Sequence, residues 1–282
     1  MRIIESPASL RQELAPLRGK DRIALVPTMG CLHEGHLNLI RKARHLGDTV
    51  VVSIYVNPLQ FGPNEDFASY PRTFDADADL CKAEEVDLIF HPQNLYPKGS
   101  PKVSLQIEDL ADMMCGAGRP GHFEGVATVV NILFNVVQPD IAVFGEKDWQ
   151  QLAIIRRMVN DLQMPVEVIG AETAREENGL AMSSRNRYLN SDERRQATAL
   201  FSALEAMREA ASAGATTGAS QADQLIEAGL AILNEHAINP EYLEIRDEKT
   251  LVPLAALDTG TPRAFVAAKV GPARLIDNMQ LT

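Results

Sequence analysis

Two histidines, His33 and His36, lie three residues apart in the stretch P-T-M-G-C-L-H-E-G-H at residues 27–36. If a helix begins near His33, both imidazoles lie on one helical face and point toward the same ligand. Backbone N–H groups and the positive end of the helix dipole favour a phosphate at such a start. The residues therefore predict a site for a nucleoside triphosphate. The alternative is a surface His33 and a buried His36 without a ligand.

A second group of polar residues, Lys147, Asp148 and Gln151, follows the apolar run I-A-V-F at residues 141–144. Lys147 is placed to meet a phosphate if that run is a strand of a parallel sheet. Asp148 either caps the following helix or binds a ribose hydroxyl. Gln151 comes three residues after Asp148 and shares its helical face.

The third group is the stretch A-M-S-S-R-N-R at residues 181–187. Two hydroxyls, from Ser183 and Ser184, and the planar guanidinium of Arg185 supply hydrogen-bond donors that suit a phosphate. Loops of this kind often close when substrate binds. An ordinary surface loop is the alternative.

Two further loops carry groups that suit a small acid. Asn57 and Gln60 follow the apolar run at residues 49–56, and their amides both donate and accept hydrogen bonds. Arg119 and His122 lie in the glycine-rich stretch G-R-P-G-H-F-E-G, which we interpret as a mobile flap that carries two cationic or potentially cationic groups toward an anion. The alternatives are a simple turn and an ordinary helix start.

The elements that must position these groups alternate between strands and helices through the first two thirds of the chain. Strands are predicted at residues 23–26, 49–56, 86–90, 141–144 and 166–169, and helices at 37–46, 73–85, 125–137 and 149–162. Each strong motif follows a strand end, which is where parallel sheets bind ligands.

The character of the chain changes after residue 187. Two alanine-rich helices are predicted at residues 192–211 and 221–236, with a flexible stretch at 213–220 between them, and strands at 242–246 and 264–270. We therefore expect an α/β fold of two domains. Residues 1–187 would form a Rossmann-like parallel sheet with helices on both faces, and residues 188–282 a smaller C-terminal α+β lid.

Composition narrows the class of protein. The 282 residues include 27 lysines and arginines against 38 acidic residues, a net charge of −11, so nucleic acid is not an expected partner. No apolar run reaches the roughly 18 residues of a membrane span, and the first residues lack a signal peptide's apolar region. Three cysteines form no C-x-x-C pair and leave an odd number. We expect a cytoplasmic protein.

Two weaker features receive a structural interpretation. Asp75, Asp77 and Asp79 alternate along a predicted helix, where alternate side chains diverge, so we assign them to the helix end rather than to a metal site. Cys31 is expected to be a small buried thiol rather than a nucleophile.

H-x-G-H and M-S-S-R resemble the two signature motifs of the adenylate-forming nucleotidyltransferases. Five ordered motifs are more specific: P-T-M-G-x-L-H-E-G-H, N-P-x-Q-F, R-P-x-H-F-x-G-V, F-G-E-K-D-x-x-Q and G-L-A-M-S-S-R-N-x-Y-L. Together they resemble the pantoate–β-alanine ligase (pantothenate synthetase) family over residues 27–189, and more loosely beyond. Cys31 stands where that family commonly has alanine.

The resemblance implies a cytoplasmic, homodimeric ligase of pantothenate and coenzyme A synthesis. It would join (R)-pantoate to β-alanine with ATP and Mg²⁺, through a pantoyl-adenylate, and release AMP and pyrophosphate. Its partners would be these small molecules, with no nucleic acid and no membrane. The alternatives are a nucleotidyltransferase whose product keeps the nucleotidyl group, and a non-enzymatic nucleotide-binding or RNA-associated regulator.

The resemblance also assigns the site residues. The ATP site would comprise Met29, Gly30, Cys31, Leu32, His33, Glu34, Gly35, His36, Gly145, Glu146, Lys147, Asp148, Ala174, Met182, Ser183, Ser184 and Arg185. The catalytic residues would be His36, as proton donor, with His33, Lys147 and Arg185. Pantoate would be bound by Gln60 and Gln151, in a cavity also lined by Asn57, Arg119 and His122. No residue is assigned to a metal.

Overall fold

The computed structural model describes residues 1–63, 65–96, 101–213 and 221–281. The chain forms two compact units, one of Met1–Glu146 and Ile154–Glu172, the other of Lys147–Ala153 and Thr173–Thr282. The functional domains predicted at residues 1–187 and 188–282 stay a prediction, because the units are defined by packing alone. Residues 214–220 of the predicted flexible stretch lie outside the described residues.

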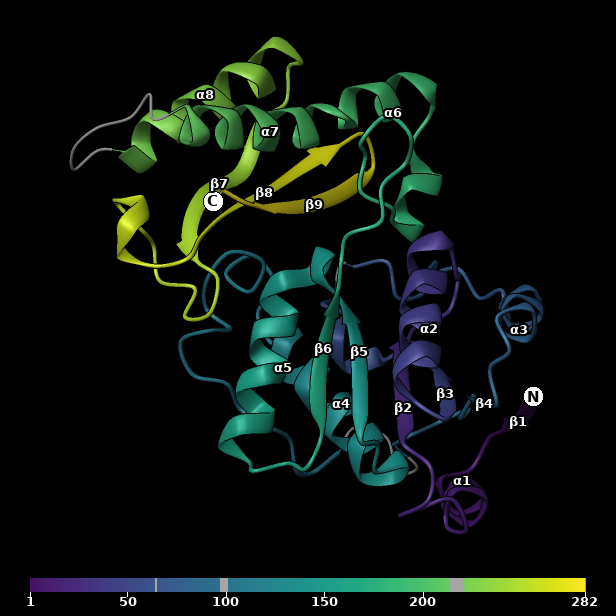
Figure 1. The fold of residues 1–282 in the computed structure, drawn as a ribbon. Coiled ribbons are helices and arrows are strands. Elements are labelled where there is room, and N and C mark those ends of the chain that lie inside the picture. Colours follow the sequence, from purple (N-terminus) through teal and green to yellow (C-terminus); the bar gives the residue numbers. More distant parts are fainter. Residues whose placement is uncertain (64, 97–100, 214–220, 282) are drawn as a thin grey trace. The chain divides into compact units, whose positions relative to one another are not determined.

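The first unit contains a six-stranded parallel sheet in the order β1-β4-β3-β2-β5-β6 (Figure 1). The strands are β1 (Arg2–Ile4), β2 (Ile23–Thr28), β3 (Thr49–Ile54), β4 (Leu88–Phe90), β5 (Ile141–Gly145) and β6 (Glu167–Ala171). Strand β2 is central and pairs with β3 on one side and β5 on the other. The strand order reverses there, which makes the carboxyl ends of these strands the expected ligand-binding edge. The predicted Rossmann-like sheet is confirmed.

Helices cover this sheet because its inner strands β2, β3, β4 and β5 are buried along nearly their whole length. They are α1 (Pro7–Leu14), α2 (Glu34–Leu46), α3 (Phe74–Ala83), α4 (His122–Val137) and α5 (Trp149–Asp161). Alternate strand residues such as Val26 and Val52 pack with Ile40 of α2 in one core. Helix α2 contacts α3, and α1 contacts α4. Helix α4 begins at His122, earlier than the predicted start at residue 125, so part of the predicted flap is helical.

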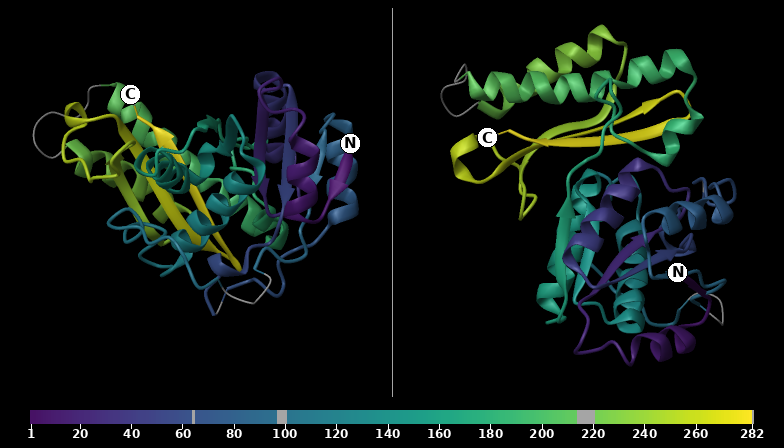
Figure 2. Two further views of the ribbon diagram at one scale, coloured as in Figure 1. Left: turned by 90° about the horizontal axis from the view of Figure 1, so that it is seen from below. Right: turned by 45° about the vertical axis from the view of Figure 1, so that its right-hand side comes forward.

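The second unit contains a three-stranded antiparallel sheet in the order β7-β8-β9. Its strands are β7 (Pro240–Asp247), β8 (Pro262–Val270) and β9 (Ala273–Gln280), and helices α7 (Ala199–Ser212) and α8 (Gln221–Glu235) lie along it (Figure 2). Leu204, Leu233 and Val266 belong to the core between these helices and strands. The predicted α+β character is confirmed, although β9 was not predicted.

The single helix predicted at residues 192–211 is wrong. The chain forms α6 (Ser191–Ala197) and then α7, with Thr198 between them. The hydroxyl of Thr198 donates to the carbonyl of Arg195 at 2.7 Å. A local side-chain bond of this kind competes with the helical pattern and explains the break.

Among the helices that the structure describes, none is long and apolar enough to span a bilayer.

Candidate active site

His33 and His36 begin helix α2, directly after the central strand. His33 is the N-cap, and its Nδ1 accepts the N–H of Gly35 at 3.2 Å. The backbone N–H of His33 donates in turn to Nδ1 of His36 at 3.3 Å. The two ring centroids are 4.1 Å apart, so the predicted placement on one face is confirmed. Because each Nδ1 is an acceptor, the proton of a neutral ring lies on Nε2, the nitrogen turned away from the helix backbone.

The backbone that leads to His33 is held by Asp77 of α3. Its two carboxylate oxygens accept the N–H groups of Cys31 at 2.9 Å and Leu32 at 2.8 Å. Cys31 has a φ of 51°, which side-chain-bearing residues rarely adopt. Gly30 has a φ of 79°, and a Cβ there would lie 2.9 Å from the Asp77 carboxylate. The turn between β2 and α2 therefore depends on Asp77.

The sequence interpretation of Asp77 as a simple helix-end charge was wrong. Asp77 is only 2 % exposed, whereas Asp75 and Asp79 are exposed. One signal in the sequence sets Asp77 apart from Asp75 and Asp79. Cys81 follows Asp77 by four residues on the same helical face, and the burial of Cys81 places that face inward. Burial, together with the charge of Asp77, raises the pKa of the Cys81 thiol to about 12. Cys31 is a fully buried thiol, as predicted.

Asn57 and Gln60 form a turn at the carboxyl end of β3, within and beside the short 3-10 helix η1 (Pro58–Gln60). The Asn57 amide donates to Gln60 Oε1 at 2.9 Å and to the carbonyl of Gly125 at 3.1 Å. Asn57 Oδ1 accepts from the hydroxyl of Tyr96 at 2.9 Å. Asn57 is 1 % exposed. Its amide is therefore engaged in orienting Gln60, whose own NH₂ group is directed away from Asn57.

Helix α4 approaches this turn closely at Gly125. A Cβ on Gly125 would lie 2.3 Å from the carbonyl oxygen of Leu59, which is a severe clash. The absence of a side chain at Gly125 thus allows η1 to rest on α4.

Arg119 and His122 also gather around Gln60. Arg119 forms two hydrogen bonds with Glu65, at 2.8 and 2.5 Å. His122 Nδ1 lies 2.8 Å from the carbonyl of Gln60, and its Nε2 lies 2.9 Å from Arg119 Nη1. A carbonyl only accepts hydrogen bonds, so Nδ1 of His122 is the donor in its contact with Gln60.

That Arg119 and His122 carry cationic or potentially cationic groups toward an anion stays a prediction. The charge of Arg119 is balanced by Glu65. Arg119 and His122 both contact the backbone carbonyl of Gln60. Burial works to raise the pKa of Glu65, but its hydrogen bonds with Arg119 and the charges of Arg119 and His122 lower it overall.

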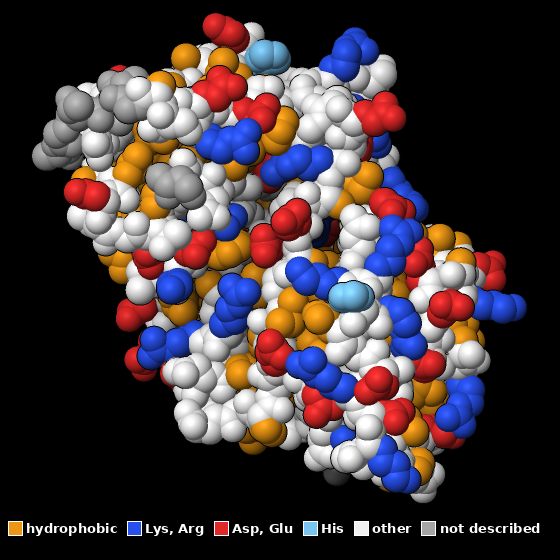
Figure 3. Space-filling view, in the orientation of Figure 1, with side chains coloured by type: hydrophobic (Ala, Val, Ile, Leu, Met, Phe, Trp, Pro, Cys, Tyr) orange, Lys and Arg blue, Asp and Glu red, His pale blue; other side chains and the backbone are white. Residues whose placement is uncertain are grey.

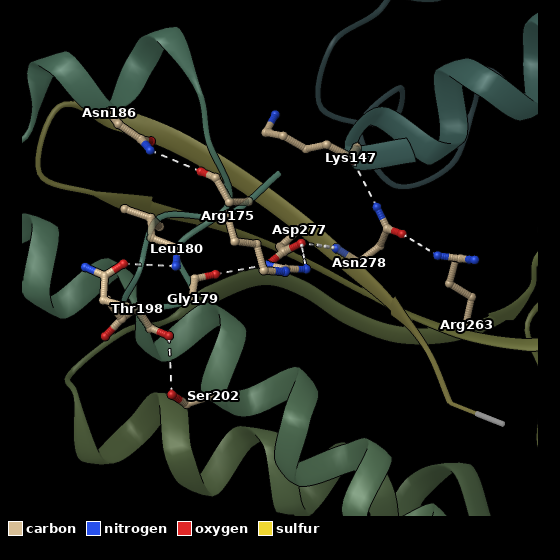
Figure 4. A network of polar contacts seen from close by, with 12 residues as sticks. Lys147, Arg175, Gly179, Leu180, Asn186, Thr198, Ser202, Arg263, Asp277 and Asn278 are labelled. Atoms are coloured by element: carbon tan, nitrogen blue, oxygen red, sulfur yellow. Dashed lines mark hydrogen bonds and ion pairs between the residues drawn. The ribbon is translucent and has the colours of Figure 1, made fainter. Parts of the chain in front are cut away.

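Lys147 and Asp148 follow the end of β5 in the 3-10 helix η2 (Glu146–Asp148). Gly145 and Glu146 belong to the first unit, whereas Lys147, Asp148 and Gln151 belong to the second. The Lys147 ammonium lies 3.7 Å from the Asp148 carboxylate. The Lys147 carbonyl accepts from Asn278 Nδ2 at 3.0 Å (Figure 4). Gln151 lies in the first turn of α5 and is partly exposed.

The M-S-S-R segment follows a hairpin-like turn in the second unit. The N–H of Met182 donates to the carbonyl of Ala174 at 2.9 Å, so these two predicted nucleotide-binding residues are neighbours. Ser183 caps the 3-10 helix η3 (Ser184–Tyr188), because its hydroxyl accepts the N–H of Arg185 at 3.2 Å. The predicted loop is thus a defined helical turn.

Four residues that support these segments were not singled out in the sequence: Glu65, Tyr96, Asp277 and Asn278. Each acts on a residue far away in the chain, so no local motif announces it. Among the described residues, no group of three or more His, Cys, Asp or Glu side chains is arranged to hold a metal ion. Basic and acidic side chains are interspersed over the face drawn in Figure 3.

Comparison with known proteins gives consistent matches over the whole chain. The family model for pantoate-beta-alanine ligase matches residues 2–280. A pantothenate synthetase from Chromohalobacter salexigens is 50 % identical over 277 residues, covering 97 % of this chain and 96 % of that protein. One from Magnetococcus marinus is 51 % identical over 271 residues, covering 94 % and 91 %.

Solved structures agree. The pantothenate synthetase of Thermus thermophilus superposes with a TM-score of 0.93 at 46 % identity, covering 100 % of this chain and 99 % of that one. A pantoate-β-alanine ligase from Francisella tularensis, complexed with "Beta-gamma ATP" and β-alanine, has a TM-score of 0.81 at 31 % identity, covering 100 % and 98 %.

Proposed function

The chain belongs to the pantoate–β-alanine ligase family, and we propose that it condenses (R)-pantoate with β-alanine through a pantoyl-adenylate, releasing AMP and pyrophosphate. The observation that carries this proposal is the pair of imidazoles that begins α2 beyond the central strand. Their ring protons on Nε2 and the helix N-terminus form a donor set for nucleotide phosphates.

In the proposed first step, a carboxylate oxygen of pantoate attacks the α-phosphorus of ATP. A bond from that oxygen to phosphorus forms, the bond to the β-phosphate breaks, and pyrophosphate leaves. Two anions meet in this step, so hydrogen-bond donors and cations matter more than a general base. His33 and His36 would donate to phosphoryl oxygens as negative charge develops. We propose that Lys147 and Arg185 bind the same nucleotide.

Mg²⁺ would enter with ATP as part of the substrate complex. Magnesium is commonly held by substrate phosphates with one or two carboxylates rather than by an all-protein cage. The absence of a three-ligand cluster among the described residues is compatible with such an arrangement. The ion would neutralise phosphate charge during pyrophosphate departure.

Pantoate would be oriented by Gln60. Asn57 holds the Gln60 amide oxygen, so its NH₂ group is presented as a donor, which suits a hydroxyl or carboxylate oxygen of the acid. Gln151 is proposed to contribute a second amide, as the family resemblance implies.

In the proposed second step, the neutral amine of β-alanine attacks the acyl carbon of the adenylate. The carbon–nitrogen bond forms, the nitrogen loses one proton that solvent finally takes up, the carbon–oxygen bond to the phosphate breaks, and AMP leaves. Exclusion of water protects the mixed anhydride from hydrolysis. We propose that residues 188–282 act as the lid that provides this exclusion.

Pantoate-dependent exchange of labelled pyrophosphate into ATP tests the adenylate. Exchange should require pantoate and should not require β-alanine. A folded protein that forms the amide product without any exchange would contradict the mechanism. Recovery of AMP with pantothenate, rather than a nucleotidylated product, separates the ligase from the alternative nucleotidyltransferase.

The role of Gln60 has a matched test. Gln60→Glu keeps the oxygen that Asn57 binds but replaces the NH₂ donor by an anion. We expect the KM for pantoate to rise at least tenfold while the KM for ATP changes little, because one donor to an anionic substrate is worth roughly 1.5–3 kcal/mol. Gln12→Glu, on the exposed surface of α1, is the control of equal charge. An equal change in both KM values would contradict the assignment. Cytoplasmic location and the homodimer stay predictions.

A further inference from the structure

We propose that Asn278, on β9, is a positioning residue for Lys147. The proposal rests on the proposed function, because it takes Lys147 as a nucleotide-binding residue. Asn278 and Lys147 belong to the same compact unit and are 131 residues apart in the chain. Asn278 would act through the backbone of Lys147, without touching the nucleotide itself.

The amide of Asn278 is fixed in one orientation by two unlike partners (Figure 4). Its Nδ2 donates to the carbonyl of Lys147 at 3.0 Å, and its Oδ1 accepts from Arg263 Nη1 at 2.8 Å. A carbonyl cannot donate and a guanidinium cannot accept, so only an amide satisfies both contacts. Asn278 is 4 % exposed and Arg263 is 7 % exposed, which makes both contacts costly to lose.

Arg263, the acceptor-side partner of Asn278, also contacts Trp149, the residue after Asp148. Its guanidinium lies 3.4 Å from the ring centroid of Trp149. The indole N–H of Trp149 donates to the carbonyl of Glu248 at 2.7 Å, and the Glu248 carboxylate lies 3.3 Å from Arg263. The segment from Lys147 to Trp149 is therefore held at both ends, by Asn278 on its backbone and by Arg263 on its ring.

Asp277, the residue before Asn278 on β9, supports a different segment. Asp277 binds Arg175 through two hydrogen bonds, at 2.6 and 3.0 Å. Arg175 also donates to the carbonyl of Gly179, in the turn that precedes Met182. Adjacent residues of a strand project to opposite faces, so Asp277 and Asn278 reach two separate parts of the proposed nucleotide site.

Backbone support matters for Lys147 because its ammonium sits on a flexible four-carbon stem. The side chain cannot define its own position, so the location of the charge depends on where the main chain is held. A misplacement of about 1 Å in a reacting assembly can lower a rate about 100-fold. Loss of the Asn278 contact should therefore reduce nucleotide chemistry by about 10-fold to 100-fold.

The test is a double-mutant cycle of Asn278→Asp and Lys147→Ala in the full chain, read by pantoate-dependent pyrophosphate exchange. Asn278→Asp keeps the acceptor for Arg263 but cannot donate to the Lys147 carbonyl. We expect about a 10-fold to 100-fold loss with Lys147 present and less than about a twofold further loss in Lys147→Ala, because the two residues act as one unit. In the complete ligase reaction of Asn278→Asp, the KM for ATP should rise while the KM for β-alanine stays unchanged.

Three controls keep the outcomes distinct. Asn234→Asp makes the same chemical change at an exposed position of α8 and should leave exchange unchanged. Trp149 is the one tryptophan of the chain, so its fluorescence reports whether Arg263 and the fold are retained. If Asn278→Asp fails to fold, Asn278→Ala replaces it in the cycle.

Equal losses from the Asn278 substitution with and without Lys147 would overturn the positioning role while leaving the proposed function intact. Normal exchange in Lys147→Ala would overturn the assigned role of Lys147, and the inference with it.

Discussion

Replacing Asp77 with asparagine should destabilise the protein and displace the backbone that leads to His33. The carboxylate accepts two buried backbone N–H groups, at 2.9 and 2.8 Å, and the hydroxyl of Thr73 at 3.2 Å. Asparagine keeps one oxygen and places an NH₂ group against the other N–H. The substitution therefore loses a hydrogen bond to a charged acceptor and leaves a buried donor without a partner.

The size of the effect follows from these contacts. A hydrogen bond to a charged group contributes roughly 1.5–3 kcal/mol, and an unsatisfied buried donor costs roughly 1–3 kcal/mol. These terms overlap, so we expect the free energy of unfolding to fall by about 3 kcal/mol. The left-handed backbone of Cys31 adds to the sensitivity, because strained conformations persist only where their surroundings hold them.

Urea unfolding followed by far-ultraviolet circular dichroism measures this loss. Asp79→Asn is the matched control, because Asp79 lies on the same helix and is exposed. Its effect should stay within about 0.5 kcal/mol. The KM for ATP should also rise in Asp77→Asn and not in Asp79→Asn. Equal stability losses in the two variants, or none in Asp77→Asn, would refute the reasoning.

Two further predictions follow from the cluster around Gln60. Gly125→Ala should raise the KM for pantoate at least tenfold, because the added methyl would lie 2.3 Å from the Leu59 carbonyl and force η1 to move. Gly118→Ala is the control, because its added methyl would have no neighbour closer than 4.0 Å, and it should leave the KM for pantoate unchanged. Glu65 has a lowered pKa in the folded state, so its contribution to stability is complete above the usual glutamate pKa of about 4.3 and is lost as pH falls through the folded value. The stability difference between the parent and Glu65→Gln should therefore be large near neutral pH and vanish in acid, and a difference independent of pH would contradict the ion pair.

Much of the sheet could be predicted because its strands are local apolar runs. Strands β2, β3 and β5 are buried on both faces, and each is followed by a recognisable motif. The pairing of His33 and His36 could also be predicted, because helical spacing brings residues three apart together. These features depend only on neighbouring residues.

The support of the site could not be predicted in the same way. Asp77 binds backbone groups 45 and 46 residues away, and Glu65 binds Arg119 from 54 residues away. The orientation of the His122 ring depends on the Gln60 carbonyl and the Arg119 guanidinium, which only the folded chain brings together. Strand β9 was missed because the polar pair Asp277 and Asn278 interrupts its apolar pattern. Both residues are nonetheless buried, and their hydrogen bonds with distant residues compensate for that burial.

The imidazole cap of α2 affects how substitutions at His33 should be interpreted. Alanine at position 33 removes a proposed phosphate donor and also the acceptor of the Gly35 N–H, and the loss of an N-cap alone costs about 1 kcal/mol. A low activity in that variant would thus mix a chemical defect with a frayed helix start. Asparagine keeps a capping oxygen without an imidazole, so it separates the two roles.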